Sequence, residues 1–197
     1  MKKEPYKYFP QTKEELRNLI EQRIKVEGNK VNLNDIDVSA ITDMSGLFEI
    51  LKDFNGNISK WDVSHVTDMS SMFFGCVSFN QDLSDWDVSQ VTTMNDMFYN
   101  CTHFNQNLSN WNVSQVTDMA GLFFNCRDFN QNLSNWDVSN VTDMRFMFYY
   151  CENFNNDISK WDVSKVTDMI RMFSDCPIKD EYKPKFEIID EPHIDIR

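Results

Sequence analysis

The sequence predicts an α/β solenoid in which stacked parallel strands are backed by short helices. Trp and Cys each recur every 25 residues along the 197-residue chain, and a fixed period of this size is typical of stacked repeats. The common unit is F-N-x-x-[IL]-S-x-W-[DN]-V-S-x-V-T-x-M-x-x-[ML]-F-x-x-C-x-x. One unit cannot bury its own apolar side chains, so about six such units must stack. The repeated residues are Trp61, Trp86, Trp111, Trp136 and Trp161, and Cys76, Cys101, Cys126, Cys151 and Cys176.

Each unit begins with a predicted strand. Leu83, Trp86 and Val88 follow the L-x-x-L-x-L spacing of a short strand, and Trp86 and Val88 would point to the same side. Strands of neighbouring units would pair at about 4.8 Å to form a parallel sheet.

A short helix is predicted after the strand. Its apolar residues fall at i, i+3, i+4 and i+7, which is one face of a helix of two to three turns. In one unit they are Met94, Met97, Phe98 and Cys101. Thr92 would be the N-cap, and the next position is Asp in five of six units, where a carboxylate meets the positive end of the helix dipole.

The loop that returns to the next strand carries a Phe and an Asn in every unit, for example Phe79 and Asn80. Stacked Asn amides would form a ladder that satisfies loop carbonyl groups, because no strand reaches them. We therefore interpret the Asn column as structural.

Both ends of the repeat region, residues 31–178, are expected to be capped within a single domain of residues 1–197. Residues 1–30 would form a helical cap, because Thr12-x-x-Glu15 is a capping box and the chain reaches Gly28 after an amphipathic stretch. That apolar face comprises Leu16, Leu19, Ile20 and Ile24. Residues 179–197 would form the other cap, with Phe186 and Ile188 in a seventh strand at the edge of the sheet.

The repeated F-N-Q-[DN]-L-S-[DN]-W-[DN]-V-S-[QN]-V-T-x-M, followed by M-F-x-x-C, resembles the BspA-like leucine-rich-repeat family. The resemblance covers about residues 33–178. The family includes a bacterial domain of unknown function with 25-residue repeats, often found in surface lipoproteins. The resemblance implies a right-handed leucine-rich-repeat-like solenoid and a role in binding or adhesion rather than catalysis.

The charge of −12 argues against a nucleic-acid-binding protein, because binding to phosphates needs a basic stripe. No apolar run approaches the roughly 18 residues of a membrane span. Charged residues replace the apolar region of a signal peptide near the N-terminus. We therefore expect a cytoplasmic protein without membrane insertion, or a cell-surface protein if a longer natural form is exported.

The sequence also argues against an enzyme. The Ser residues recur in every repeat, as turn residues do, whereas a catalytic site needs one singular arrangement. The Cys share a predicted face with Met and Phe, which favours buried free thiols over disulfides or a metal site. We expect no cofactor and no metal.

Two columns of surface residues are candidates for function. The Asp or Asn after each Trp would point out of the sheet, where it either pairs with nearby Ser hydroxyls and loop amides or forms an acidic strip for a basic partner or a cation. The second column is aromatic, and packing between repeats is favoured over partner binding for it. Its members are Phe74, Tyr99, Phe124 and Tyr149.

From these patterns we predict a non-enzymatic protein-binding scaffold that uses the exposed sheet face. The alternative is a module for cations or glycans, or a surface adhesin or antigen, that uses the Asp and Asn ladder. The partner would be another protein, and a monomer is favoured. The candidate binding residues are Lys60, Asp62, Asp85, Asp87, Asn110, Asn112, Asn135, Asp137, Lys160 and Asp162.

Overall fold

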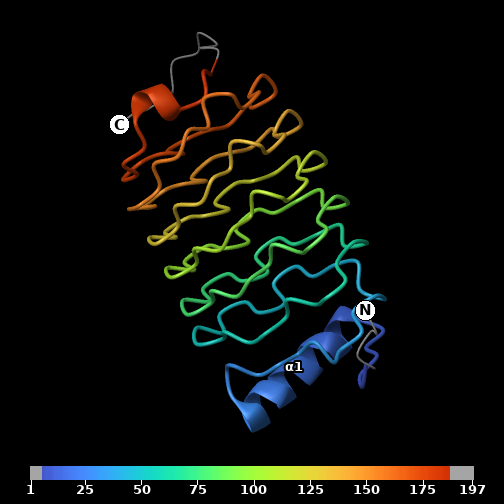
Figure 1. The fold of residues 1–197 in the computed structure, drawn as a ribbon. Helices are drawn as coiled ribbons and strands as arrows, with labels where there is room; N and C mark the ends of the chain where they lie inside the picture. Colours follow the sequence, from blue (N-terminus) through green and yellow to red (C-terminus); the bar gives the residue numbers. More distant parts are fainter. Residues whose placement is uncertain (1–5, 187–197) are drawn as a thin grey trace.

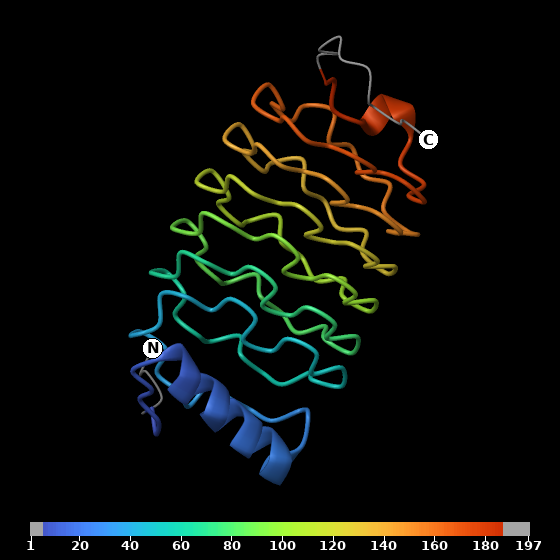
Figure 2. The ribbon, with the colours of Figure 1, turned by 180° about the vertical axis from the view of Figure 1, so that it is seen from behind.

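The chain winds as a stack of six coils, one above the next (Figure 1). The computed structural model describes residues 6–186. Coils 1 to 6 comprise residues 29–53, 54–78, 79–103, 104–128, 129–153 and 154–178. Parallel bridges join equivalent positions of successive coils, at Asp43, Asp68, Thr93, Asp118, Asp143 and Asp168. Residues 25 apart in sequence therefore lie side by side, and the view from behind shows the same succession (Figure 2).

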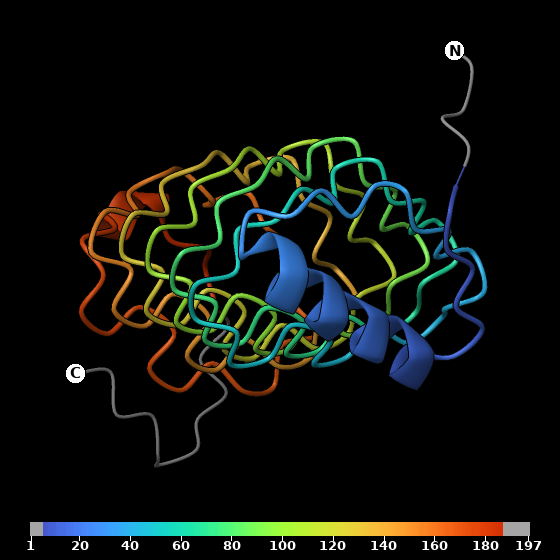
Figure 3. The same cartoon turned by 90° about the horizontal axis from the view of Figure 1, so that it is seen from below.

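Helix α1, Lys13–Glu27, lies across the end of the stack at coil 1 (Figure 3). The Thr12 hydroxyl caps it by accepting the Glu15 N–H at 3.2 Å, as the capping-box pattern predicts. The Glu15 carboxylate accepts the N–H of Gln11 at 2.7 Å instead of the Thr12 N–H that a capping box uses. The helix ends before Gly28, whose φ of 85° is one that glycine adopts without steric cost.

The buried face of α1 covers the first layer of the core. Leu16 and Ile20 are fully buried, in agreement with the amphipathic pattern. Lys13 on the other side forms an ion pair with Asp43 of coil 1 at 2.8 Å. The helix thus shields apolar side chains that have no preceding coil to cover them.

A run of tight turns stands where the sequence predicts a short helix in each coil. In coil 2 this turn segment is residues 69–76. The N–H of Met72 donates to the carbonyl of Met69, three residues back, at 3.2 Å. The N–H of Phe73 instead points to the next coil, where it donates to the carbonyl of Met97 in coil 3 at 2.9 Å. Backbone hydrogen bonds therefore alternate between the coil itself and the next coil.

The predicted helices are wrong because the coils are too close together to hold them. The ring centroids of Phe73 and Phe98, at equivalent positions, are 5.6 Å apart, whereas packed helix axes need about 8–10 Å. The turns also use left-handed residues, with φ of 54° at Ser71 and 73° at Gly75, as the third position of a type II turn requires. The inward side chains that the helical pattern identified are buried all the same.

The predicted strands are replaced by turns as well. In coil 3 the N–H of Trp86 donates to the carbonyl of Leu83 at 3.1 Å, and the Asp82 carboxylate accepts the Ser84 N–H at 2.9 Å. Such side-chain bonds to nearby backbone compete with strand pairing. Within residues 6–186 the structure therefore has isolated bridges and no sheet.

The residues predicted to start the helices take other roles in the turns. The Thr92 hydroxyl donates to the carbonyl of Thr67 in the preceding coil at 3.1 Å, instead of capping a helix. The Asp68 carboxylate accepts the N–H of Ser70 at 2.8 Å, two residues on. These bonds fix the turns and link the coils.

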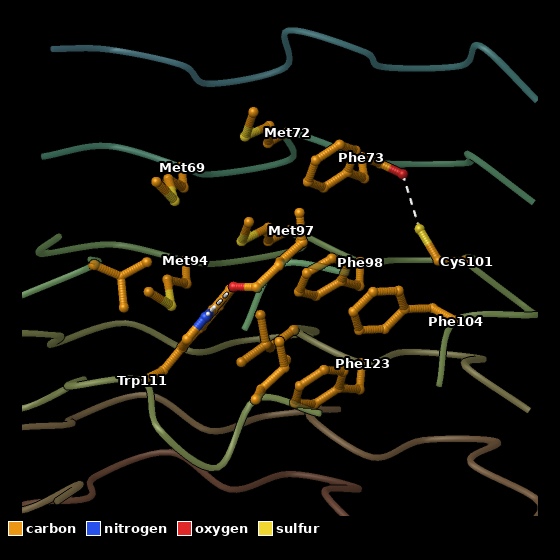
Figure 4. Close-up of a cluster of buried hydrophobic side chains, with 14 of the residues drawn as sticks. Met69, Met72, Phe73, Met94, Met97, Phe98, Cys101, Phe104, Trp111 and Phe123 are labelled. Carbon is orange, nitrogen blue, oxygen red and sulfur yellow. Dashed lines mark hydrogen bonds between the residues drawn. The ribbon is translucent and has the colours of Figure 1, made fainter. Parts of the chain in front are cut away.

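The core contains the same set of side chains in successive layers (Figure 4). Phe98 is fully buried, and its ring lies between those of Phe73 and Phe123. The Trp111 indole N–H donates to a buried carbonyl of coil 3 at 3.0 Å, and the Cys101 thiol donates to the Phe73 carbonyl at 3.0 Å. Even the polar atoms of these large side chains are therefore satisfied by neighbouring coils.

The Asn column forms the predicted ladder, but with the opposite hydrogen-bonding sense. The side-chain oxygen of Asn80 accepts the backbone N–H of Asn105 at 3.0 Å and the side-chain amide of Gln106 at 2.9 Å. The column therefore satisfies N–H donors of the next coil rather than loop carbonyls.

The C-terminal end keeps the register of the stack. The 3-10 helix η1, Asp180–Tyr182, follows coil 6, and the Tyr182 carbonyl accepts the N–H of Ile158 at 3.0 Å. Phe186 is half-buried against the core. The predicted seventh strand extends to Ile188, which lies outside the described residues.

Candidate functional site

The residues predicted to bind a partner lie together on one exposed surface, which we call the Trp face. It consists of the residues on either side of each Trp from coil 2 to coil 6. They are Lys60, Asp62, Asp85, Asp87, Asn110, Asn112, Asn135, Asp137, Lys160 and Asp162, and all are exposed. Turns rather than a sheet carry this surface.

The carboxylates that follow each Trp on this face are hydrogen-bonded within their own coils. The side-chain oxygen of Asp87 accepts the Ser89 N–H at 3.0 Å. That of Asp137 accepts the N–H of Ser139 at 3.1 Å and its hydroxyl at 2.7 Å. Hydrogen bonds from the Ser side chain and backbone hold the pKa of Asp87 and of Asp137 below the usual value of 3.8. Pairing with neighbouring Ser residues, one of the two roles that the sequence left open, is therefore present.

A second surface, which we call the turn wall, lies on the outward side of the turn segments. In coil 2 its positions are residues 70, 71, 74 and 75, whereas residues 69, 72, 73 and 76 are buried. The buried positions repeat almost unchanged, but the outward ones differ from coil to coil. In coils 3, 4 and 5 they hold Asn95, Asp96, Tyr99 and Asn100, then Ala120, Gly121, Phe124 and Asn125, then Arg145, Phe146, Tyr149 and Tyr150.

A column of stacked aromatic rings runs along the turn wall. The ring centroids of Phe74 and Tyr99 are 4.6 Å apart, those of Tyr99 and Phe124 4.1 Å, and those of Phe124 and Tyr149 4.8 Å. The rings are half-buried, so the packing between repeats that the sequence predicts is present and part of each ring still faces the surface. Tyr150, which is 41% exposed, packs edge-on against Tyr149 and extends the aromatic surface.

A pocket of about 440 Å³ lies in the turn wall where coils 3, 4 and 5 meet. Its lining includes the rings of Tyr99, Phe124 and Phe146 and the side chains of Asp96 and Asp118. Phe146 meets Phe124 at a ring angle of 64° and Tyr149 at 78°, so it stands beside the column of stacked rings instead of continuing it. The pocket is therefore walled by both aromatic rings and carboxyl groups.

Gly121 leaves space for the carboxylate of Asp96. A Cβ atom at Gly121 would lie 2.1 Å from the Asp96 Oδ1, closer than any real contact allows. The φ of Gly121 is 60°, yet the equivalent Ser71 and Phe146 carry side chains at φ of 54° and 58°. The backbone thus accepts a side chain at this position, and it is the Asp96 carboxylate that a side chain at Gly121 would displace.

The pocket carries an excess of negative charge. Arg145 forms ion pairs with Asp143 at 3.0 Å and Asp168 at 3.8 Å, which occupy its guanidinium group. Burial raises the pKa of Asp96, and the nearby Asp118 carboxylate adds to the rise. A raised carboxyl pKa means that the charge is poorly compensated where it lies.

Sequence reasoning missed the pocket. Its signal was present as departures from the repeat at outward positions: Gly121 where coils 2, 3, 5 and 6 have larger residues, and Phe146 and Arg145 where coil 2 has two Ser. Which of these departures lie next to one another follows only from the stacking of the coils.

The five thiols are free, as the sequence predicts; four are buried and Cys176 is half-buried. Burial raises the pKa of Cys76 to about 12 and that of Cys176 to about 11. His103 contacts the carboxylate of Asp128 on the surface at 2.9 Å. The described residues contain no cluster of His, Cys, Asp and Glu arranged to hold a metal ion. Among the same residues, no helix is both long and apolar enough to cross a membrane.

One family matches this chain. The profile described as "Mycoplasma protein of unknown function, DUF285" matches residues 14–123 and again residues 105–183. No curated protein and no solved structure matches the chain. The two family matches together include most of α1, all six coils and the start of the C-terminal cap. The chain therefore belongs to the DUF285 family of Mycoplasma proteins of unknown function.

Proposed function

We propose that the chain is a non-enzymatic scaffold that binds another protein, and that the turn wall is its binding surface. The observation that carries this proposal is the contrast between a repetitive interior and a varied outer wall. Exposed aromatic residues are enriched where proteins bind one another, and a wall that differs from coil to coil presents a distinct surface to one partner.

The Trp face supports binding less well than the turn wall does. The Asp after each Trp repeats in nearly every coil, and one carboxylate oxygen of it, as in Asp87 and Asp137, holds a turn together. A local role thus accounts for the recurrence of these residues.

The stack itself supports a further part of the proposal, that the fold is a solenoid related to the BspA-like leucine-rich-repeat family. The 25-residue register, the end-capping helix α1 and the single continuous core favour it. Extended surfaces on such stacks are what repeat proteins use for binding.

Random peptides displayed on phage provide a test that needs no known partner. Peptides selected on the full chain are measured against two variants that borrow residues from other coils. Tyr150→Asn alters the turn wall, because coils 3 and 4 have Asn at that position with φ of 59° and 53°. Asp137→Asn alters the Trp face, because coil 4 has Asn112 there.

We expect the selected peptides to bind Tyr150→Asn at least about tenfold more weakly than the wild type, since aromatic residues at the centre of interfaces contribute about 2 kcal/mol or more. We expect Asp137→Asn to bind them as the wild type does. Loss of binding in Asp137→Asn with retention in Tyr150→Asn would move the binding surface to the Trp face. If no peptide is enriched over a blank surface, the proposal that the chain is a peptide-binding scaffold is refuted.

A further inference from the structure

We propose that the pocket between coils 3, 4 and 5 receives the side chain of an arginine on the partner protein. This proposal rests on the proposed function, because it names the chemistry that the turn wall recognises. It is carried by the pocket geometry, by the rings that line it and by its unbalanced carboxylates.

The pocket is large enough for one long side chain. Its volume of about 440 Å³ lies within the range of roughly 300–1,000 Å³ for ligand pockets. Tyr99 and Phe124 form one wall, and neighbouring rings of the column cover their faces. Phe146, which lies outside the column, forms another wall. A flat guanidinium group can stack on the face of an aromatic ring such as Phe146, and it is less strongly hydrated than an ammonium group.

The charges of the pocket favour a cation. Asp96 and Asp118 both line it, and they are opposed by one lining cation, Arg145, whose charge is shared with Asp143 and Asp168. An incoming guanidinium can donate two parallel hydrogen bonds to one carboxylate. An anion would meet carboxylates on entering, so acidic partners are disfavoured.

Gly121 makes the Asp96 carboxylate available to such a ligand. With no side chain there, the carboxylate occupies the space that a Cβ would fill. The same position holds Ser71 in coil 2 and Arg171 in coil 6. Coil 1 also has a glycine there, Gly46, but only at Gly121 does an Asp carboxylate fill the space. A Gly121→Ser variant is therefore a specific way to push the carboxylate aside on a backbone that already accepts Ser.

The experiment titrates the full 15N-labelled chain with N-acetyl-arginine methylamide and follows amide chemical shifts. We expect saturable shifts at Asp96, Gly121 and Phe124, with a dissociation constant of about 1 mM or weaker, as for a single side chain. Asp96→Asn should weaken binding about tenfold, a typical loss for one charge-assisted contact. Gly121→Ser should do the same. Asp85→Asn, which removes the same charge from the Trp face, should leave the affinity unchanged.

Three further probes decide the chemistry. The citrulline analogue has the shape of arginine without its charge, so equal binding would overturn the role of the carboxylates. Equal binding of the lysine analogue would overturn the arginine assignment in favour of any cation. Shifts of the same amides by chitotriose, with none from the arginine probe, would replace the peptide ligand by a glycan. Unfolding midpoints of the variants, measured alongside, show that they are folded.

The outcomes for the pocket and for the scaffold are separable. Selected peptides that bind the wild type and Gly121→Ser equally, yet lose affinity for Tyr150→Asn, would leave the turn wall as the binding surface and refute the arginine pocket. Selected peptides that share an arginine and lose affinity for Gly121→Ser would support both. If no peptide is enriched, the scaffold fails, and saturation by the arginine probe then reports on the pocket alone.

Discussion

Removing one ring from the middle of the core, in Phe98→Ala, tests whether the stacked layers hold the coils together. Phe98 is fully buried and lies between the rings of Phe73 and Phe123, at centroid distances of 5.6 and 5.7 Å. It also stacks on Phe104 at 4.1 Å. Trp111 packs against it as well, at 6.3 Å. The ring thus contacts four others from neighbouring coils, and the rigid stack leaves little freedom to close a cavity.

Truncation of a buried Phe to Ala costs about 3–5 kcal/mol, and each aromatic pair contributes about 0.5–1.5 kcal/mol beyond its buried area. We therefore expect a loss of about 4–5 kcal/mol for Phe98→Ala, a large part of the roughly 5–15 kcal/mol that stabilises typical domains. Phe173 is the matched control. It is half-buried in the last coil, where its ring stacks on Phe148, so Phe173→Ala should cost about 1–2 kcal/mol by the same reasoning.

Equilibrium unfolding in urea, followed by Trp fluorescence, measures both losses. One Trp in each of coils 2 to 6 reports on the whole stack, and unchanged slopes with denaturant would show that the midpoints reflect stability alone. If Phe98→Ala and Phe173→Ala cost the same, or if Phe98→Ala costs less than about 1 kcal/mol, the stacked core does not carry the stability assigned to it.

Three other predictions concern titratable groups. Alkylation of the native protein followed by mass spectrometry should label Cys176 slowly, because at pH 8 a pKa of about 11 leaves about one thiolate in a thousand. Cys101 should not be labelled until the protein unfolds, and equal labelling rates for the two thiols would contradict the burial of Cys101. Asp96→Asn should raise the thermal unfolding midpoint at pH 7. Burial raises the pKa of Asp96, so the stability that this carboxyl group contributes when protonated is lost as the pH rises through its raised pKa. The midpoints of variant and wild type should coincide below pH 3.8, and a lower midpoint for the variant at pH 7 would refute the prediction. Asp137→Ala should lower the free energy of unfolding by about 0.5–1 kcal/mol at neutral pH, and this loss should shrink as the pH falls through the lowered pKa of Asp137. Asp137→Asn keeps an acceptor oxygen and should cost less. A loss for Asp137→Ala that grows in acid would rule out a stabilising role for the carboxylate hydrogen bonds.

The repeat made much of the interior predictable from sequence. The buried Met, Phe, Trp and Cys positions and the helix over Lys13–Glu27 follow from apolar spacing and capping residues. The stacking of Phe74 on Tyr99 follows from their recurrence every 25 residues. These features depend on which residues are apolar and how far apart they are, and both are written in the chain.

The backbone path between those positions was not predictable in the same way. Met94, Met97, Phe98 and Cys101 have the spacing of a helix face, but an inward-pointing pattern of this kind also fits a run of turns. The distance between coils decides between a helix and a run of turns. It is 5.6 Å between the ring centroids of Phe73 and Phe98, and it is set by side chains and hydrogen bonds from adjacent repeats. No local window of sequence contains that distance.

The sequence by itself determined the register, the buried layers and the polar residues that make the turns, because each depends on residue type and period. Tertiary structure alone decided that the coils stack too closely for helices and that Asp96, Gly121 and Phe146, each 25 residues from the next, share one pocket. Residues that differ from the repeat form a site only when neighbouring coils bring them into contact, and that contact depends on the stacking of the whole chain.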